Sequence, residues 1–123
     1  MRTKKTESKK KVLFLITGSI AAVRIPLLVS QLVKENYEIK CVLSKNAEKF
    51  IKPLSLSILS RTPCILEDDQ WLSMQSTPLH IGLCNWADIL IIAPLTATTL
   101  SKWVTGNADG LIPSILMANI KPI

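Results

Sequence analysis

The first segment whose residues could do chemistry is a turn of small residues near the start of the chain. Gly18 and Ser19 follow an apolar run over residues 12–16 and precede a stretch with helical spacing. Such a turn exposes backbone N–H groups at the positive end of a helix dipole, where a phosphate binds without needing a lysine. The spacing is not that of a Gly-x-Gly-x-x-Gly dinucleotide site, and a plain strand-to-helix turn is the alternative interpretation.

A second polar segment follows another predicted strand. Ser44, Lys45 and Asn46 offer a hydroxyl, a charge and an amide. These groups suit contacts with a phosphate or with a ribityl chain. Capping of a helix by Ser44 or Asn46 is the competing interpretation.

Three threonines cluster after the buried apolar run over residues 88–93. Thr96, Thr98 and Thr99 stand at the start of a predicted helix, with Ala97 among them. Their hydroxyl groups could hydrogen-bond the carbonyls and ring nitrogens of a flat heterocycle. Simple capping of the helix by Thr96 is the alternative.

His80 is the only histidine in the chain. An imidazole titrates near neutral pH, which suits proton transfer, although a lone histidine more often has a structural role. The three cysteines, Cys41, Cys64 and Cys84, are widely spaced and form no Cys-x-x-Cys pair. We therefore expect buried thiols rather than disulfides, and no metal site.

These residues need a scaffold, and the hydrophobic pattern predicts one. Strands are predicted over residues 12–16, 38–44, 63–67 and 88–93. Helices are predicted over residues 20–34 (with its start near Arg24 or a kink there at Pro26), 46–51, 53–60, 79–85, 94–105 (opened by Pro94) and 109–118 (capped by Asp109), with an acidic loop over residues 67–78. Strands that alternate with helices and are apolar on both faces indicate a parallel, doubly wound α/β sheet. Ligands bind beyond the carboxyl ends of the strands in such sheets, which is where the three polar segments begin.

Length and charge narrow the class of protein. The chain has 123 residues, which suits one domain, and a formal net charge of +6. Residues 1–11 hold six basic side chains against one acidic, whereas the other residues hold nine against eight. We therefore expect a disordered basic tail over residues 1–10, a nearly neutral body and no nucleic-acid partner. No apolar run approaches the ~18 to 20 residues of a membrane span, and no secretory signal is evident, so a soluble cytoplasmic protein without a membrane partner is expected.

Four stretches between Lys11 and Ile123 carry a family resemblance. In order they are KVLFLITGSIAA, CVLSKNAEKFI with PLSLSILS, DDQW, and PLHIGLCNWADILIIAPLTATTLSKWVTGNADGL. Together they resemble the homo-oligomeric flavin-containing cysteine decarboxylases, in particular the phosphopantothenoylcysteine decarboxylases of coenzyme A biosynthesis. The resemblance implies a flavodoxin-like, Rossmann-like fold over residues 11–123, bound FMN, and homotrimers or dodecamers built from trimers.

The functional positions of that family fall on residues already singled out. The resemblance implies FMN contacts from the phosphate loop at Gly18, Ser19 and Ile20, and from a second segment at Ser44, Lys45 and Asn46. It also implies flavin contacts at Thr96, Ala97, Thr98 and Thr99, and a catalytic role for His80. Thr98 stands where the family motif has asparagine, which removes an amide from the site.

The resemblance also implies a reaction, the FMN-dependent decarboxylation of 4'-phosphopantothenoylcysteine to 4'-phosphopantetheine. The flavin would take a hydride as the cysteinyl thiol is oxidised to a thioaldehyde, and the neighbouring carboxylate would then leave as CO₂. The reduced flavin would reduce the resulting enethiol, so the cofactor supplies the redox chemistry. His80 would act as the acid/base beside the flavin.

The chain ends before two later motifs of the family, PXMNxxMW and a cysteine-bearing substrate clamp. Residues 121–123 are expected to begin a further strand, so an incomplete flavoprotein domain with weak or no turnover is predicted. One alternative is a catalytically dead flavin-fold binding or regulatory protein, which Thr98 favours. Another is a flavin prenyltransferase-like enzyme, which is similar at the phosphate loop, although the histidine of PLHI argues against it.

Overall fold

The computed structural model describes residues 8–72 and 76–123. The predicted tail over residues 1–10 therefore lies outside the described residues, except for residues 8–10, which are exposed and adopt no regular structure. The predicted acidic loop over residues 67–78 is described apart from residues 73–75, which also lie outside the described residues.

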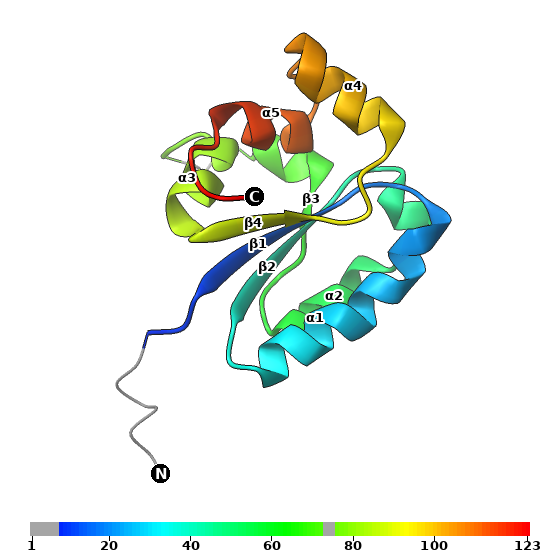
Figure 1. Cartoon of the computed structure of the whole chain (residues 1–123), viewed down its shortest axis with the longest axis vertical. Helices are drawn as coiled ribbons and strands as arrows, with labels where there is room; N and C mark the ends of the chain where they lie inside the picture. Colours follow the sequence, from blue (N-terminus) through cyan, green and yellow to red (C-terminus); the bar gives the residue numbers. More distant parts are fainter. Residues whose placement is uncertain (1–7, 73–75) are drawn as a thin grey trace.

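Strands and helices alternate along the described chain (Figure 1). The strands are β1 (Lys11–Ile16), β2 (Glu38–Leu43), β3 (Ile65–Leu66) and β4 (Ile89–Ile92). The α-helices are α1 (Ile25–Lys34), α2 (Pro53–Ser60), α3 (Leu79–Trp86), α4 (Ala97–Thr105) and α5 (Leu111–Ala118). Three short 3₁₀ helices join them: η2 (Ile20–Arg24), η3 (Ala47–Lys49) and η4 (Glu67–Trp71).

The four strands are parallel and form one sheet in the order β3-β2-β1-β4. Because β1 lies between β2 and β4, the segments that follow these three strands leave the sheet side by side at its carboxyl edge. The chain reverses its crossover direction beside β1, as doubly wound sheets do. The predicted flavodoxin-like α/β architecture is confirmed.

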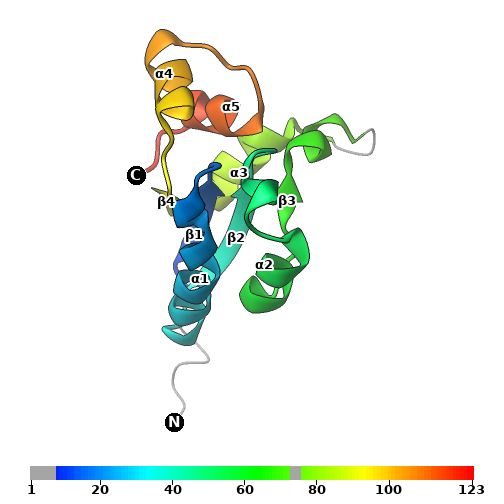
Figure 2. The ribbon, with the colours of Figure 1, turned by 90° about the vertical axis from the view of Figure 1, so that its right-hand side faces the viewer.

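Helices cover both faces of this sheet (Figure 1, Figure 2). α1 and α2 pack on one face, against Val12, Phe14 and Ile16 of β1. α3 and α5 cover the opposite face, against Leu13 and Leu15. All five side chains are buried. A strand that is covered on both faces needs apolar residues at every position, which explains the continuous apolar run.

The helix predicted over residues 20–34 is divided in two. The 3₁₀ helix η2 comes first, and α1 begins at Ile25 with Pro26 in its first turn. This agrees with the predicted start near Arg24, because proline is tolerated in a first turn but not in a helix interior. The helix predicted over residues 46–51 forms only the single 3₁₀ turn η3.

Pro94 does not open a helix, so this prediction was wrong. α4 begins at Ala97, and the hydroxyl of Thr96 caps it by accepting a hydrogen bond from the N–H of Thr99 at 3.3 Å. The segment before α4 is bonded to the end of β1 instead. The hydroxyl of Thr17 donates to the Pro94 carbonyl at 2.5 Å and accepts from the N–H of Thr96 at 3.0 Å.

Asp109 does not cap α5, which corrects a second prediction. The N-cap position belongs to Gly110, whose φ of +117° is a conformation that favours glycine. The side chain that binds the N–H of Leu111 is Glu67, which directly follows β3 at the carboxyl edge of the sheet. Glu67 also begins η4, so the strand predicted over residues 63–67 is shorter than expected.

Residues 121–123 were expected to begin another strand, and none is assigned there. The N–H of Leu90 in β4 nevertheless donates to the carbonyl of Pro122 at 2.9 Å. This last described segment therefore runs beside β4, on the side away from β1.

Candidate functional site

A pocket of about 400 Å³ lies beyond the carboxyl ends of the strands. Its strand side comes from the segments that follow β1, β2, β3 and β4: Gly18, Ser44, Lys45, Asn46, Glu67 and Thr96. Its helix side comes from α4, the next loop and α5: Thr98, Thr99, Lys102, Asp109, Gly110, Ile112 and Pro113. Ligand pockets of small molecules typically occupy about 300 to 1,000 Å³, and this one lies where parallel sheets bind their ligands.

Gly18 lets the turn after β1 approach the turn after β2. A Cβ atom at this position would stand 2.7 Å from the carbonyl carbon of Asn46 and 2.9 Å from the nitrogen of Ala47. Both neighbours are backbone atoms that cannot rotate away. No described residue accepts a hydrogen bond from the N–H of Gly18 or Ser19, so these donors are free for a ligand.

The hydroxyl groups of two serines cap short helices at this edge. Ser19 Oγ accepts from the N–H of Ala21 at 3.2 Å, at the start of η2. Ser44 Oγ accepts from the N–H of Ala47 at 3.1 Å, at the start of η3. Ser44 therefore supplies the capping hydrogen bond, whereas Asn46, which holds the N-cap position of η3, makes no such bond with its side chain. Ser44 also lines the pocket.

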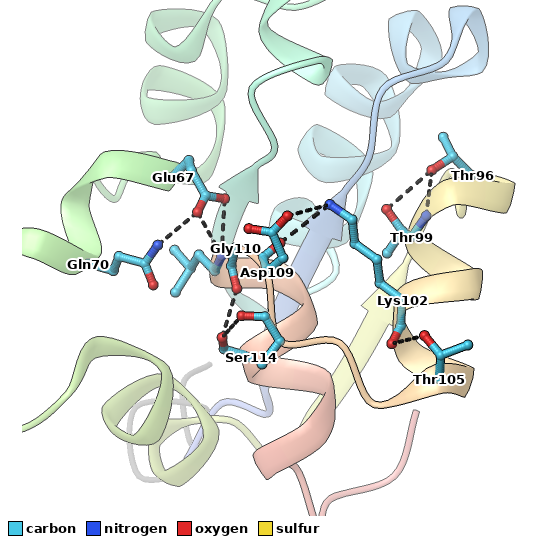
Figure 3. A network of polar contacts seen from close by, with 11 residues as sticks. Glu67, Gln70, Thr96, Thr99, Lys102, Thr105, Asp109, Gly110 and Ser114 are labelled. Carbon is cyan, nitrogen blue, oxygen red and sulfur yellow. Dashed lines mark hydrogen bonds and ion pairs between the residues drawn. The ribbon is translucent and has the colours of Figure 1, made fainter.

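Lys45 and Lys102 bring cations to opposite sides of the pocket. Lys45 Nζ lies 3.5 Å from a carboxylate oxygen of Asp68, and both side chains are largely exposed. Lys102 Nζ lies 3.6 Å from a carboxylate oxygen of Asp109 and donates to the Asp109 carbonyl at 3.4 Å (Figure 3). Sequence reasoning missed Lys102. Its position three and four residues after Thr99 and Thr98, on the same helix face, was the available signal.

Glu67 is the second site residue that the sequence analysis missed. Its carboxylate oxygens accept the N–H of Leu111 at 2.8 and 3.0 Å, and Gln70 Nε2 donates to it at 2.8 Å (Figure 3). A Cβ atom on Gly110 would lie 3.3 Å from both carboxylate oxygens. The hydrogen bond joins residues 44 positions apart, so no local sequence pattern predicts it.

His80 does not line this pocket. It stands in the first turn of α3 and lines a neighbouring cavity of about 320 Å³, together with Gln70, Trp71, Pro78, Leu79, Ala108, Asp109, Gly110 and Ser114. Asp109 and Gly110 line both cavities and so separate them.

The structure thus brings together most of the predicted binding residues, but not all of them. Gly18, Ser44, Lys45, Asn46, Thr96, Thr98 and Thr99 share one pocket. Ser19, Ile20 and Ala97 adjoin these residues in the chain without lining it, and His80 lies in the second cavity. Within residues 8–72 and 76–123, no three His, Cys, Asp or Glu side chains are placed to hold a metal ion. No helix in the same ranges is long and apolar enough to cross a membrane.

A family profile described as Flavoprotein matches residues 1–122. The chain is 35% identical over 113 residues to the phosphopantothenoylcysteine decarboxylase of Mus musculus, covering 91% of this chain and 55% of that protein. It spans only 29% of a second relative, the coenzyme A biosynthesis bifunctional protein CoaBC of Borreliella burgdorferi.

Two solved structures are similar over most of the chain. A PPC decarboxylase mutant complexed with pantothenoylaminoethenethiol superposes with a TM-score of 0.78 at 34% identity, covering 92% of this chain and 62% of that one. The FMN-dependent cysteine decarboxylase SpaF superposes with a TM-score of 0.83 at 25% identity, covering 92% and 65%.

Proposed function

Because the chain belongs to the Flavoprotein family, we propose that it binds FMN in the pocket at the carboxyl edge of the sheet. We further propose that it contributes to the decarboxylation of 4'-phosphopantothenoylcysteine to 4'-phosphopantetheine. The observation that carries the proposal is that three segments that follow different strands line a single pocket, through Gly18, Ser44, Lys45, Asn46, Thr96, Thr98 and Thr99.

The donor set of the pocket fits the parts of FMN. The free N–H groups of Gly18 and Ser19 suit a phosphate, since backbone donors beside a helix start bind anions. The hydroxyl and amide groups of Ser44 and Asn46 suit a ribityl chain. Ile112 and Pro113 give the helix side an apolar surface for a flat ring.

When bound, FMN supplies two-electron chemistry to the substrate side chain. In this proposal the chain's own residues bind and orient the reactants. The turn at Gly18 holds the phosphate, and the threonines at the start of α4 hold the ring. His80 moves the proton, from the cavity that shares Asp109 and Gly110 with the pocket.

We also propose that the chain assembles with copies of itself, as a trimer. Ile20, Leu27, Leu54 and Ile58 are apolar yet between 66% and 78% exposed. They lie on η2, α1 and α2, which cover the same face of the sheet. Apolar side chains gathered on one side of a small domain indicate a surface that another protein covers.

The binding step is tested by titrating the chain with FMN and with riboflavin, and by measuring the quenching of flavin fluorescence. We expect FMN to bind at least tenfold more tightly, because riboflavin lacks the phosphate. Equal affinities would contradict the proposed phosphate site. Light scattering in the same buffer measures the oligomeric state, and a monomer at all concentrations would contradict the trimer.

The catalytic step is tested by CO₂ release from 4'-phosphopantothenoylcysteine, with the FMN-loaded chain and its His80→Asn variant. We expect at most slow release by the wild-type chain, as the predicted weak turnover implies, and loss of that release in the variant, with FMN affinity unchanged. A chain that binds FMN but releases no CO₂ would support the second candidate, a flavin-binding protein without turnover. Thr98, which has no side-chain amide, is the residue that favours this candidate.

A further inference from the structure

One face of α4 lines the pocket and carries a cation, the side chain of Lys102. Thr98, Thr99 and Lys102 all line it, and their spacing of three and four residues places them on the same side of the helix. The side chain of Lys102 is 32% exposed, against 68% for Lys45 on the strand side. Its charge is therefore the less screened of the two by solvent.

The partner of Lys102 leaves much of that charge available. Asp109 binds it at 3.6 Å, but the side chain of Asp109 is 77% exposed. An ion pair with so exposed a carboxylate contributes little net energy. The other acid of the pocket, Glu67, has both oxygens engaged by the N–H of Leu111.

The two sides of the pocket carry different chemical groups, which suit different ends of the ligand. The free backbone donor of Gly18 lies on the strand side of the pocket, while the apolar Ile112 and Pro113 lie on the helix side with Lys102. A phosphate belongs with the first set of groups, and a flat aromatic ring with the second.

From this arrangement we infer that Lys102 faces the ring of the bound flavin and stabilises the negative charge that the ring gains on two-electron reduction. The inference rests on the proposed FMN site. A flavin that takes up two electrons and one proton becomes an anion, and a fixed cation near its ring favours that form over the oxidised one. Lys102 donates no proton in this role; it raises the affinity of the chain for reduced FMN.

The experiment measures the midpoint potential of bound FMN by anaerobic dye equilibration, for the wild-type chain and the variants Lys102→Met, Lys102→Arg and Lys34→Met. Lys34 is an exposed lysine at the far end of α1 and serves as the matched control. We expect Lys102→Met to weaken the binding of reduced FMN, relative to that of oxidised FMN, about tenfold. This corresponds to a midpoint potential lower by ~30 mV for a two-electron couple. Lys102→Arg should retain most of the wild-type potential, and Lys34→Met all of it.

The affinities for FMN and riboflavin complete the test. A Lys102→Met chain that binds FMN with an unchanged potential would overturn the inference alone. A loss of FMN affinity without loss of riboflavin affinity would also overturn it, because the lysine would then contact the phosphate. A wild-type chain that binds no flavin would overturn the proposed function and, with it, this role of Lys102.

Discussion

The carboxylate of Glu67 occupies the amino end of helix α5, where it accepts the N–H of Leu111 at 2.8 and 3.0 Å. A carboxylate at this position satisfies a donor that the helix leaves free, and its charge complements the helix dipole. Both η4 and α5 contribute to the pocket wall, so this contact fixes the width of the pocket between the end of β3 and the helix side.

Glu67→Ala should lower the free energy of unfolding by about 1 to 2 kcal/mol, as the loss of a helix cap does. Glu67→Gln should cost less, because an amide oxygen still accepts the hydrogen bond without the charge. Urea denaturation followed by circular dichroism measures both. Glu48→Ala is the matched control, an exposed glutamate for which a change within about 0.5 kcal/mol is expected. Equal effects of the Glu67→Ala and Glu48→Ala variants would show that the cap contributes nothing.

Gly18→Ala should impair FMN binding, whereas Gly82→Ala should not. An alanine Cβ at position 18 would overlap the backbone of Asn46, which overpacks the turn at a cost of about 1 to 3 kcal/mol. At Gly82, in α3, a Cβ would meet nothing within 4 Å, and alanine should stabilise the helix by about 0.5 to 1 kcal/mol. FMN titration of both variants, with thermal unfolding as the check on folding, gives the comparison. Wild-type FMN affinity in a folded Gly18→Ala chain would contradict the close approach.

The thiols of Cys41 and Cys64 should make the fold less stable at alkaline pH. Burial raises the pKa of each to about 12, from 9.0 for a free thiol. Between these values the unfolded chain releases protons that the folded chain retains. Their stabilising effect is therefore complete below pH 9 and lost as the pH rises toward 12. For Cys41, which is buried, the slope reaches up to about 1.4 kcal/mol per pH unit.

Alkylation with iodoacetamide at pH 8 checks the same property directly. Because the thiolate is the reacting species, Cys41 and Cys64 should react far more slowly in the folded chain than in 8 M urea. Mass spectrometry of the peptides assigns the modified residue. Similar rates in folded and unfolded chains would contradict the raised pKa values.

The part of the site that could be predicted from the sequence is the part that follows strands. Gly18, Ser44 and Thr96 come directly after apolar runs, and parallel strands bring such segments to one edge. Lys102 could be predicted only from its spacing to Thr98 and Thr99 on α4, and the start of that helix was not known from the sequence. Glu67 required knowledge of a contact across 44 residues, which only tertiary packing determines.

The start of α4 was predicted incorrectly because of another contact between residues far apart in the sequence. Locally, Pro94 is a good first residue of a helix. The buried hydroxyl of Thr17, 77 residues earlier, binds both the Pro94 carbonyl and the N–H of Thr96, and so holds this segment out of the helix. Propensity is a weak guide wherever a buried polar group from a distant strand offers a stronger alternative.

The central strand β1 has a consequence for how the chain avoids misfolding. If β1 slipped by one residue along its neighbours, Phe14 and Leu13 would exchange the two core layers that they now fill. The same slip would carry Thr17 away from Pro94 and Gly18 away from Asn46. A register shift that disrupts the pocket therefore also disrupts the packing on both faces of the sheet. The free energy of folding of the whole domain thus selects the register that the binding site requires.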